Sequence, residues 1–416
     1  MLIKKYLFSI FVRGFISFSG FLVFLISANL FGAEGRGVIS YGTAVFAAIG
    51  IFLSFNLGRA YLSVTNKNDK LKKDLLPIFL VLNIIAILVT VLLSLLFWYF
   101  SIAAQSILDF KTMMALAVSS AFYVWSINGN AFFASLQKTH LQEMIILKTR
   151  SILILFIIVF YFASAHKLTL FLLFYSLILC AGVVVEMLIL GQGIDSIFVR
   201  PNLKNIKLVL FESIWPHLDF LGFNLFPLFL ILIAGHYLEK AQIGRINFTI
   251  QMINFIFLLA ITANIRVSSY VSNVGFISRI PQLKKLFWGT VAVSLLLSIC
   301  VFYILQVITK TDLFKSFEGT SAGFALTILA IPGYLGYQIL NPIWLEMKII
   351  KQSAIYGLIN AAVFGCLSFI VLPKYNELGA ISLFAFFYLS LFVIQGLMFV
   401  KMSQVSGREI DKVKLN

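Results

Sequence analysis

The sequence has few charged residues, few cysteines and few prolines for a chain of 416 residues. Only 12% of the residues are charged, while 61% are hydrophobic and the mean hydropathy is +1.01. A soluble domain is about half apolar and about a quarter charged. This composition therefore excludes a soluble globular protein and is that of an integral membrane protein.

The scarcity of cysteine and histidine excludes several kinds of site. Cys180, Cys300 and Cys366 all lie in apolar stretches without a CxxC pair, so we expect neither disulfides nor a thiolate metal site. The four histidines are scattered, and no Walker A, H-E-x-x-H or G-x-S-x-G pattern occurs. We expect no catalytic residue, no metal and no cofactor, and the lack of a nucleotide-binding domain disfavours an ATP-driven pump.

Acidic residues are scarce beside basic ones, with 16 Asp and Glu against 32 Lys and Arg and a formal net charge of +16. Such an excess suggests nucleic acid, but the positions of the charges favour a membrane topology. Most of the basic residues lie at the termini or in the loops on the same side of the membrane as the termini. Fewer lie in the loops of the opposite side, and Arg36 is counted among these. By the positive-inside rule, both termini are predicted in the cytoplasm, and no nucleic-acid partner is needed. Glu186, late in an apolar run, is expected at the membrane interface.

Long apolar runs are what the chain has in abundance. Runs of about 20 apolar residues cross a bilayer as helices. The first is too long for a cleavable signal and lacks a small-residue cleavage site. We predict an all-α integral membrane protein with about twelve transmembrane helices. The predicted spans are 7–31, 38–57, 76–99, 112–134, 145–163, 168–190, 208–235, 243–264, 286–307, 322–345, 354–372 and 379–400.

The two halves of the chain resemble each other. Residues 37–41 read GVISY and residues 244–248 read GRINF, a separation of 207 positions. The same separation pairs Arg59 with Arg266, each at the end of a predicted span. These matches indicate an internal repeat that begins near the middle of the chain.

A second pair of matches extends the repeat into later spans. Tyr123 pairs with Tyr334 and Asn130 pairs with Asn341, at a separation of 211 positions. Six spans per half put both halves in the same orientation across the membrane, which is a parallel repeat typical of transporters. We predict two six-helix lobes, residues 1–200 and 201–416, related by a parallel pseudo-twofold repeat.

Small and polar side chains line one face of four predicted spans. Arg13 and Ser17 fall on such a stripe in the first span at 100° per residue. Lipid cannot satisfy these groups, so the stripes should face the bundle interior, as helix contacts or as the lining of a hydrated cavity. Arg13 either faces this cavity or snorkels to the headgroups. The predicted substrate-binding residues are Arg13, Ser17, Tyr123, Asn130, Asn247, Gln251, Tyr334, Gln338 and Asn341.

The seventh span holds other deep charges, in the stretch FESIWPHLDF. Glu212 and Asp219 are seven residues apart and share a helix face, and Pro216 can kink the helix between them. The repeat would place Asp219 near the depth of Arg13, so we hypothesise a charged pair on the cytoplasmic side. The alternative is that the two acids only balance nearby basic loops. The predicted gating or coupling residues are Asp219, Glu212, Arg59 and Arg266.

Residues 29–64, NLFGAEGRGVISYGTAVFAAIGIFLSFNLGRAYLSV, resemble the opening of the polysaccharide-transporter family. These are O-antigen flippases of the multidrug/oligosaccharidyl-lipid/polysaccharide exporter superfamily. Phe31, Gly32 and Gly37 stand in the family's turn after the first span, and residues 57–60 stand in the segment that ends the second. The resemblance extends to the loop at residues 132–152 and the seventh-to-eighth span unit at residues 215–248.

The resemblance implies a multi-pass protein of the bacterial inner membrane with a role in lipopolysaccharide and polysaccharide biosynthesis. Such a protein moves an undecaprenyl-pyrophosphate-linked oligosaccharide from the cytoplasmic to the periplasmic leaflet by alternating access. Its cavity is cationic, and Arg13 fits a phosphate ligand because a guanidinium offers paired donors. The implied partners are the lipid-linked glycan, membrane lipids, and the polymerase and chain-length regulator of the same pathway. Coupling to a proton or sodium gradient is left open.

Two alternatives remain open at the level of sequence. The first is a drug/cation antiporter of the same superfamily, which would favour acidic residues in the cavity of the N-terminal lobe. The second is a multispanning O-antigen polymerase, which would carry a sizeable catalytic loop. The loops between the predicted spans are short, and deep acids are rare in the N-terminal half.

Overall fold

The computed structural model is almost entirely helical in the part of the chain that it describes, residues 2–67, 71–163, 167–192, 203–271, 280–346 and 349–414. Within these ranges, nine stretches are long and apolar enough to cross a membrane, judged by length and composition. The two longest, Gly14–Leu62 and Ile350–Val400, each contain a sharp bend that joins two helices. The predicted all-α membrane fold is confirmed.

The chain divides into two compact units. Unit 1 comprises Met1–His217 and Ile231–Gly244, and unit 2 comprises Leu218–Leu230 and Arg245–Asn416. The division falls within α9 (Leu203–Tyr237) and at the start of α10 (Lys240–Val271), so both helices contribute to both units. The lobe boundary predicted after residue 200 stays a prediction, because residues 193–202 lie outside the described ranges.

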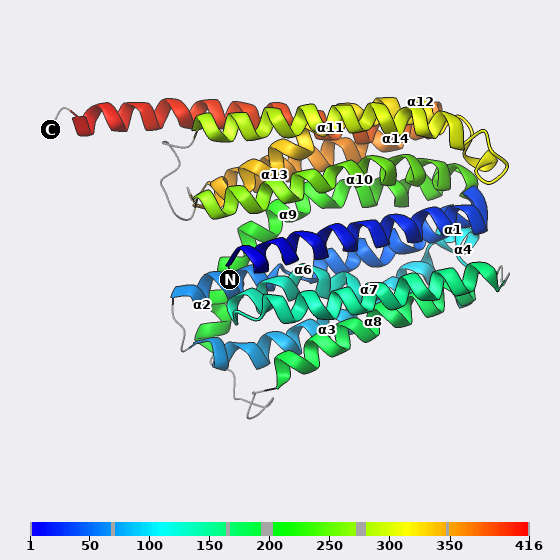
Figure 1. Ribbon diagram of the computed structural model, residues 1–416, viewed down its shortest axis with the longest axis horizontal. Helices are drawn as coiled ribbons and strands as arrows, with labels where there is room; N and C mark the ends of the chain where they lie inside the picture. The colour runs from blue at the N-terminus through cyan, green and yellow to red at the C-terminus, as the bar shows by residue number, and fades with distance from the viewer. Residues whose placement is uncertain are drawn as a thin grey trace. The chain divides into compact units, whose positions relative to one another are not determined.

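Unit 1 begins with two helical legs joined at a glycine. α1 (Leu2–Leu53) bends at Gly32, whose φ of 60° and ψ of −167° suit glycine because it has no Cβ. The N-terminus and α2 lie at the same end in Figure 1, so the second leg runs back along the first. The remaining helices of this unit are α2 (Leu57–Lys67), α3 (Leu71–Phe100), α4 (Ile102–Ile107), α5 (Phe110–Ala117), α6 (Ser120–Ser135), α7 (Thr139–Phe162) and α8 (Leu168–Gly191).

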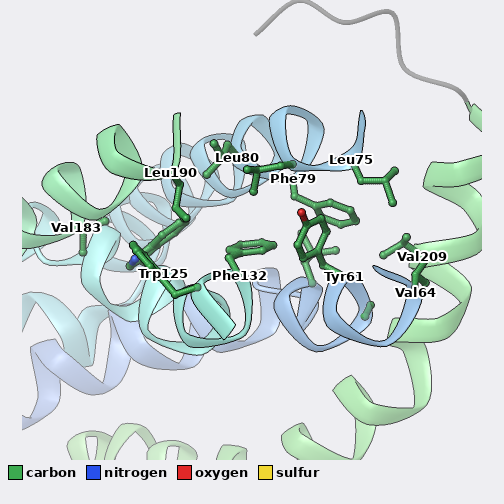
Figure 2. Close-up of a cluster of buried hydrophobic side chains, with 14 of the residues drawn as sticks. Tyr61, Val64, Leu75, Phe79, Leu80, Trp125, Phe132, Val183, Leu190 and Val209 are labelled. Carbon is green, nitrogen blue, oxygen red and sulfur yellow. The ribbon is translucent and has the colours of Figure 1, made fainter. Parts of the chain in front are cut away.

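An aromatic cluster forms the core at one end of unit 1 (Figure 2). The ring of Tyr61 packs edge-on against Phe79 and Phe132 at centroid distances of 5.4 and 5.2 Å. Trp125 lies 5.7 Å from Phe132. Such aromatic pairs stabilise a fold by about 0.5–1.5 kcal/mol beyond what burial of their surface contributes. Here they join α2, α3 and α6.

A buried asparagine fixes the break between α1 and α2. Oδ1 of Asn128 accepts a hydrogen bond from the backbone N–H of Gly58 at 3.0 Å. Its Nδ2 donates to the carbonyl of Ser54 at 3.1 Å and to Oδ1 of Asn83 at 2.9 Å. The side chain thereby satisfies backbone groups that the interrupted helix leaves without helical partners.

Unit 2 has its own aromatic core. Phe223 of α9 stacks on Tyr337 with ring centroids 3.6 Å apart, and Phe257 of α10 stacks on Tyr334 at 3.9 Å. The core thus joins α9, α10 and α13. The elements of this unit that follow α10 are α11 (Ile280–Ile308), η2 (Lys315–Phe317), α12 (Thr320–Thr327), η3 (Ile328–Ala330), α13 (Ile331–Glu346) and α14 (Ile350–Lys414).

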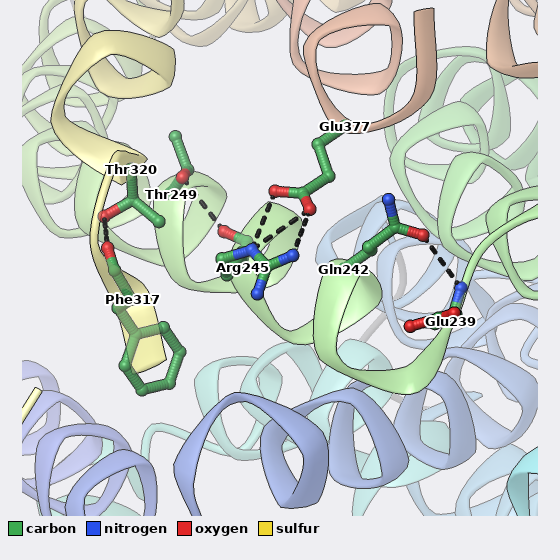
Figure 3. A network of polar contacts seen from close by, with 7 residues as sticks. All are labelled: Glu239, Gln242, Arg245, Thr249, Phe317, Thr320 and Glu377. Carbon is green, nitrogen blue, oxygen red and sulfur yellow. Dashed lines mark hydrogen bonds and ion pairs between the residues drawn. The ribbon is translucent and has the colours of Figure 1, made fainter. Parts of the chain in front are cut away.

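The helix α14 bends at Asn376, whose φ is 48°. The next residue, Glu377, forms an ion pair with Arg245 (Figure 3). Nε of Arg245, in the first turns of α10, donates to both carboxylate oxygens of Glu377 at 3.0 Å. The two side chains are 28% and 25% exposed. The pair joins α10 to the residue after the bend.

The helices of the two units follow the predicted repeat. α6 and α13 each contain 16 residues, and their first residues, Ser120 and Ile331, are 211 positions apart. The fourth span of each unit is interrupted just before these helices, at residues 118–119 and 328–330. The two halves therefore share the interruption of the fourth span as well as the helix positions.

The motif match between GVISY and GRINF marks a symmetric contact within unit 1. A Cβ on Gly37 would lie 1.8 Å from the carbonyl oxygen of Lys240, and a Cβ on Gly244 would lie 1.8 Å from that of Ala33. Gly37 and Gly244 are equivalent in the repeat, and so are Ala33 and Lys240. The contact is therefore self-complementary, as contacts across a two-fold axis are.

Candidate functional site

A carboxylate in unit 2 is buried and bonded by three neutral side chains. Asp219 of α9 is 2% exposed. Its Oδ1 accepts a hydrogen bond from Oγ of Ser353 at 2.6 Å, while Oδ2 accepts from Oη of Tyr337 at 2.7 Å and from Nδ2 of Asn341. An ionisable group inside a membrane span is costly and marks a functional site by default.

Two glycines bring the helices of this site together. Gly222 follows Asp219 by three residues, and Gly357 follows Ser353 by four. A Cβ on Gly222 would come within 2.7 Å of the backbone of Gly357. Small residues let membrane helices approach closely, and this approach places the Ser353 hydroxyl against Asp219.

The other two donors come from one face of α13. Tyr337 and Asn341 are four residues apart, which places them on the same side of the helix, and Nδ2 of Asn341 lies 3.3 Å from Oη of Tyr337. The stacking of Phe223 on Tyr337 fixes the phenol ring. The donors are therefore positioned by the packing of the surrounding helices.

A small cavity adjoins the carboxylate. It is lined by Asp219, Ser353 and Gln395, among others, and its free volume is about 10 Å³, near the lower limit for one water molecule. Oε1 of Gln395 is buried and has no hydrogen-bond partner among the described residues. Carboxylate, hydroxyl and amide oxygens are the ligands that hard cations prefer. In the same ranges, no cluster of three His, Cys, Asp or Glu side chains is suited to a transition metal.

Unit 1 also buries a carboxylate. Glu186 of α8 is 6% exposed, and its Oε2 accepts from Nε1 of Trp125 at 2.7 Å and from Nε2 of Gln142 at 3.1 Å. The interfacial depth expected for Glu186 stays a prediction, and the structure adds that its side chain turns toward α6 and α7. Periodicity could not give this orientation, since it depends on which face of α8 packs against its neighbours.

A guanidinium is buried in the same unit. Arg36, in the second leg of α1, is 7% exposed. Its Nη1 donates to Oγ of Ser27 at 3.0 Å, and its Cζ lies 4.5 Å from the ring centroid of Phe24. From the sequence alone, Arg36 is expected in the loop after the first span. The bend at Gly32 is so tight that the second leg has already begun at this position.

No protein-family model matches the chain, and no curated protein matches it. Solved structures do match. The chain has the fold of MOP-superfamily transporters. The lipid II flippase MurJ, in an inward closed conformation, matches with a TM-score of 0.69 and 14% identity over 96% of this chain and 87% of the flippase.

Two further MOP-superfamily transporters share the fold. An inward-facing multidrug resistance transporter of the MATE family matches with a TM-score of 0.67 and 11% identity over 95% of both chains. A MOP superfamily transporter from Pyrococcus furiosus matches with a TM-score of 0.58 and 11% identity over 94% of both chains. The neighbours are transporters and a flippase, and the chain shares their helical fold.

The predicted substrate-binding residues are distributed over both units. Asn341 contacts the Asp219 carboxylate, and Asn130 is exposed on α6. The side chain of Arg13 lies outside the described residues, so its binding role and its pairing with Asp219 stay predictions. Asn247 is buried, and the half-buried members of the set are Ser17, Tyr123, Gln251, Tyr334 and Gln338.

The predicted gating residues also differ in their surroundings. Asp219 is buried, but Glu212 is exposed on the same helix, so the two acids do not share a buried face. Arg59 is half-buried in α2. Arg266 belongs to α10, and its side chain lies outside the described residues.

Proposed function

We propose that this chain is a flippase for an undecaprenyl-pyrophosphate-linked oligosaccharide, the O-antigen unit of a surface polysaccharide. It moves this lipid from the cytoplasmic to the periplasmic leaflet of the bacterial inner membrane by alternating access, with both termini in the cytoplasm. The observation that carries the proposal is the buried guanidinium of Arg36 in a membrane-spanning helix. The fold shared with the lipid II flippase adds support, since that name describes a lipid as cargo.

The chemistry of the cargo suits the side chains of unit 1. The lipid tail can stay in hydrocarbon, whereas a pyrophosphate needs cationic donors and sugars need hydroxyl and amide groups. A guanidinium offers a planar pair of donors to phosphate oxygens, and Arg36 and Arg13 lie on the two legs of α1. Tyr123 and Asn130, both on α6, offer hydroxyl and amide groups to sugars.

We propose that Asp219 couples transport to an ion gradient. The carboxylate lies beside a cavity that also presents Ser353 and Gln395 oxygens, so a proton or a sodium ion bound there would exchange hydrogen bonds with α13 and α14. A gain or loss of charge at this point alters three bonds that join α9 to these helices. Asp219→Asn should abolish the dependence of transport on the gradient.

One observation favours a second candidate function, a drug/cation antiporter of the same superfamily. Such a protein needs an acidic group in its N-terminal part, and Glu186 is a buried carboxylate in unit 1. Its two neutral donors leave a net negative charge when it is ionised. An antiporter would use this charge to hold a cationic drug, whereas a flippase would use Arg36.

Deletion of the gene distinguishes these functions in the cell. A flippase deletion accumulates complete lipid-linked units on the cytoplasmic leaflet, and a polymerase deletion leaves lipopolysaccharide capped with a single unit. An antiporter deletion leaves the surface polysaccharide intact and increases sensitivity to cationic drugs. Normal long-chain polysaccharide in the deletion strain would overturn the proposal.

Complementation then tests the guanidinium. Arg36→Ala should restore export less than Arg36→Lys, because lysine keeps the charge and loses only the paired geometry. The same order is expected for Arg13→Ala and Arg13→Lys. Full export by both alanine variants would remove these arginines from the site.

A further inference from the structure

The two buried carboxylates accept hydrogen bonds from equivalent positions of the repeat. Gln142, a donor to Glu186, is 211 positions before Ser353, a donor to Asp219. The helices that carry these donors, α7 and α14, begin at Thr139 and Ile350, which are also 211 positions apart. In both units a further donor comes from the interrupted fourth span.

We propose that Glu186 is a proton-binding site of unit 1, separate from the site of Asp219. Its carboxylate takes up one proton to become a neutral carboxylic acid and releases that proton again. This goes beyond the proposed function, because it adds an ionisable centre in the unit that holds Arg36. It does not depend on the identity of the cargo.

The surroundings of Glu186 favour an exchangeable proton. The carboxylate lies between Val183 and Leu190 on α8, both members of the apolar core cluster of Figure 2, and Ile145 of α7 belongs to the same cluster. Its hydrogen bonds among the described residues go to the neutral donors Trp125 and Gln142. A charge in such surroundings is costly. Burial therefore favours the neutral, protonated form of this side chain over the charged carboxylate.

Among the described residues of the packed helices, the other ionisable groups do not bond to this carboxylate. The guanidinium of Arg150 on α7 lies 5.5 Å from the ring centroid of Phe122, and that of Arg36 on α1 bonds to Ser27. Asp74 at the start of α3 is exposed. The helices α1, α5, α6 and α7 pack against α8, and α3 and α9 contribute to the same core cluster. The remaining ionisable side chains on their described residues include Tyr41, Lys72, Lys111, Tyr123, His140, Glu143, Lys148, Lys204 and Lys207.

One oxygen of the Glu186 carboxylate accepts no hydrogen bond from the described residues. Both donors point at Oε2, so Oε1 can take the proton without displacing either donor. Protonation turns two charge-assisted bonds into neutral ones, which are about half as strong. The link between α6, α7 and α8 therefore loosens when the proton binds. Glu186 lies five residues before the end of α8 at Gly191, or about 7.5 Å along the helix.

Gly129 positions the indole donor. A Cβ at this residue would lie 2.6 Å from Nε1 of Trp125. The side chain of Trp125 therefore folds over Gly129 on the same helix before it reaches Glu186. Gly129→Ala should displace the indole from Oε2 and leave the carboxyl group itself in place.

Infrared difference spectroscopy on the purified full-length protein in lipid vesicles tests the proposal. Spectra are taken between about pH 9 and about pH 4, a range that brackets ordinary and raised carboxyl titrations. We expect a C=O stretching band of a carboxylic acid that appears at low pH in the wild type. The Glu186→Gln variant should lose one component of this band, and Asp219→Asn should retain that component.

Two further variants keep the test decisive if Glu186→Gln does not fold. Trp125→Phe and Gly129→Ala retain the carboxyl group, and each should move the frequency of its band because a donor to Oε2 is lost or displaced. The proposal is overturned if the pH-dependent carboxyl band is the same in these variants as in the wild type. No cargo is present in the measurement, so its failure is distinct from failure of the flippase proposal.

Discussion

The two units share a helical plan but bury their charges differently. Unit 2 places its carboxylate, Asp219, on its first span and bonds it with three donors, whereas unit 1 places Glu186 on its last span and bonds it with two. Both use the equivalent donor position, Gln142 or Ser353. Among the described residues of the spans, the buried guanidinium, Arg36, belongs to unit 1.

The difference separates what the repeat preserves from what it does not. Helix starts, the interruption of the fourth span and the donor position on the fifth span are common to both units. The acid, its span and the number of its donors are particular to each. A repeated backbone therefore supplies equivalent places for polar groups, and the side chains decide whether a place holds a cation, an anion or a proton.

The largest effect is expected from loss of the Asp219 acceptor. Asp219→Ala removes three buried hydrogen bonds to a carboxylate, at about 1 kcal/mol or more for each, so we expect a loss of about 3 kcal/mol or more. Thermal unfolding in lipid nanodiscs measures it. Glu212→Ala, on the exposed part of the same helix, should change stability by less than about 0.5 kcal/mol. Equal losses in the two variants would contradict the assignment of Asp219 as the centre of unit 2.

The symmetric glycine contact gives a paired prediction. Gly37→Ala and Gly244→Ala each place a Cβ 1.8 Å from a backbone oxygen, and each should cost about 1–3 kcal/mol through forced separation of the helices. The two losses should be similar, because the positions are equivalent. Gly20→Ala, where nothing lies within 4 Å, serves as the control and should be neutral or slightly stabilising. A large loss at only one of the paired glycines would break the symmetry argument.

The ion pair of unit 2 should contribute less. Arg245 and Glu377 are each about a quarter exposed, and pairs of this kind contribute about 1 kcal/mol or less. A double-mutant cycle with Arg245→Met and Glu377→Gln measures their coupling. The coupling should fall at about 1 M salt, where the Debye length is about 3 Å. A coupling that is unchanged by salt would show that packing, rather than charge, joins α10 to the bend of α14.

The smallest effect concerns a helix cap that only one unit has. Asp109 accepts a hydrogen bond from the backbone N–H of Thr112 at 2.7 Å at the start of α5, whereas the N-cap of α12 is Gly319, without a side-chain bond. Hydrogen bonding from Thr112 is the main reason that the pKa of Asp109 lies below its ordinary value of 3.8. The ionised cap therefore stabilises fully above pH 3.8, and this contribution is lost as the pH falls through the lower folded value.

Asp109→Ala should accordingly cost about 1 kcal/mol near neutral pH, and the difference from the wild type should shrink below pH 3.8. Unfolding measured across this pH range tests the sign. Asp109→Asn keeps an acceptor at the cap and cannot titrate, so its difference from the wild type should not follow the same curve. A cost for Asp109→Ala that stays constant at low pH would contradict the cap as the source.

The sequence was sufficient for the fold because span length and repeat separation are local or linear features. Apolar runs of the required length predicted the helices, and the GVISY and GRINF match predicted an internal repeat. The close contact at Gly37 and Gly244 was found only in the structure. Asp219 and Asn341 were each singled out as polar groups inside predicted spans. Their contact was not predicted, because it depends on how α9, α13 and α14 pack.

The missed residues share a physical reason. Ser353 is the last residue of the gap between two predicted spans and reads as an interfacial serine, although its spacing to Gly357 was a signal of close helix packing. Arg36 follows a glycine-rich turn and reads as a loop residue. The bend at Gly32 involves so few residues, however, that Arg36 already belongs to the next helical leg. Glu186 has a depth that sequence gives and an orientation that only packing decides. In each case tertiary contacts, rather than periodicity, placed the side chain.

Translocation in proteoliposomes tests the central claim most directly. A fluorescent undecaprenyl-pyrophosphate-linked oligosaccharide is placed in one leaflet, and its arrival in the other is measured with a membrane-impermeant quencher. We predict rapid translocation by the wild type and a loss of about 10-fold or more in Arg36→Ala, as expected for one charge-assisted bond pair of about 1.5–3 kcal/mol. Translocation no faster than in protein-free vesicles, together with transport of a lipophilic cation by the same vesicles, would contradict the flippase assignment.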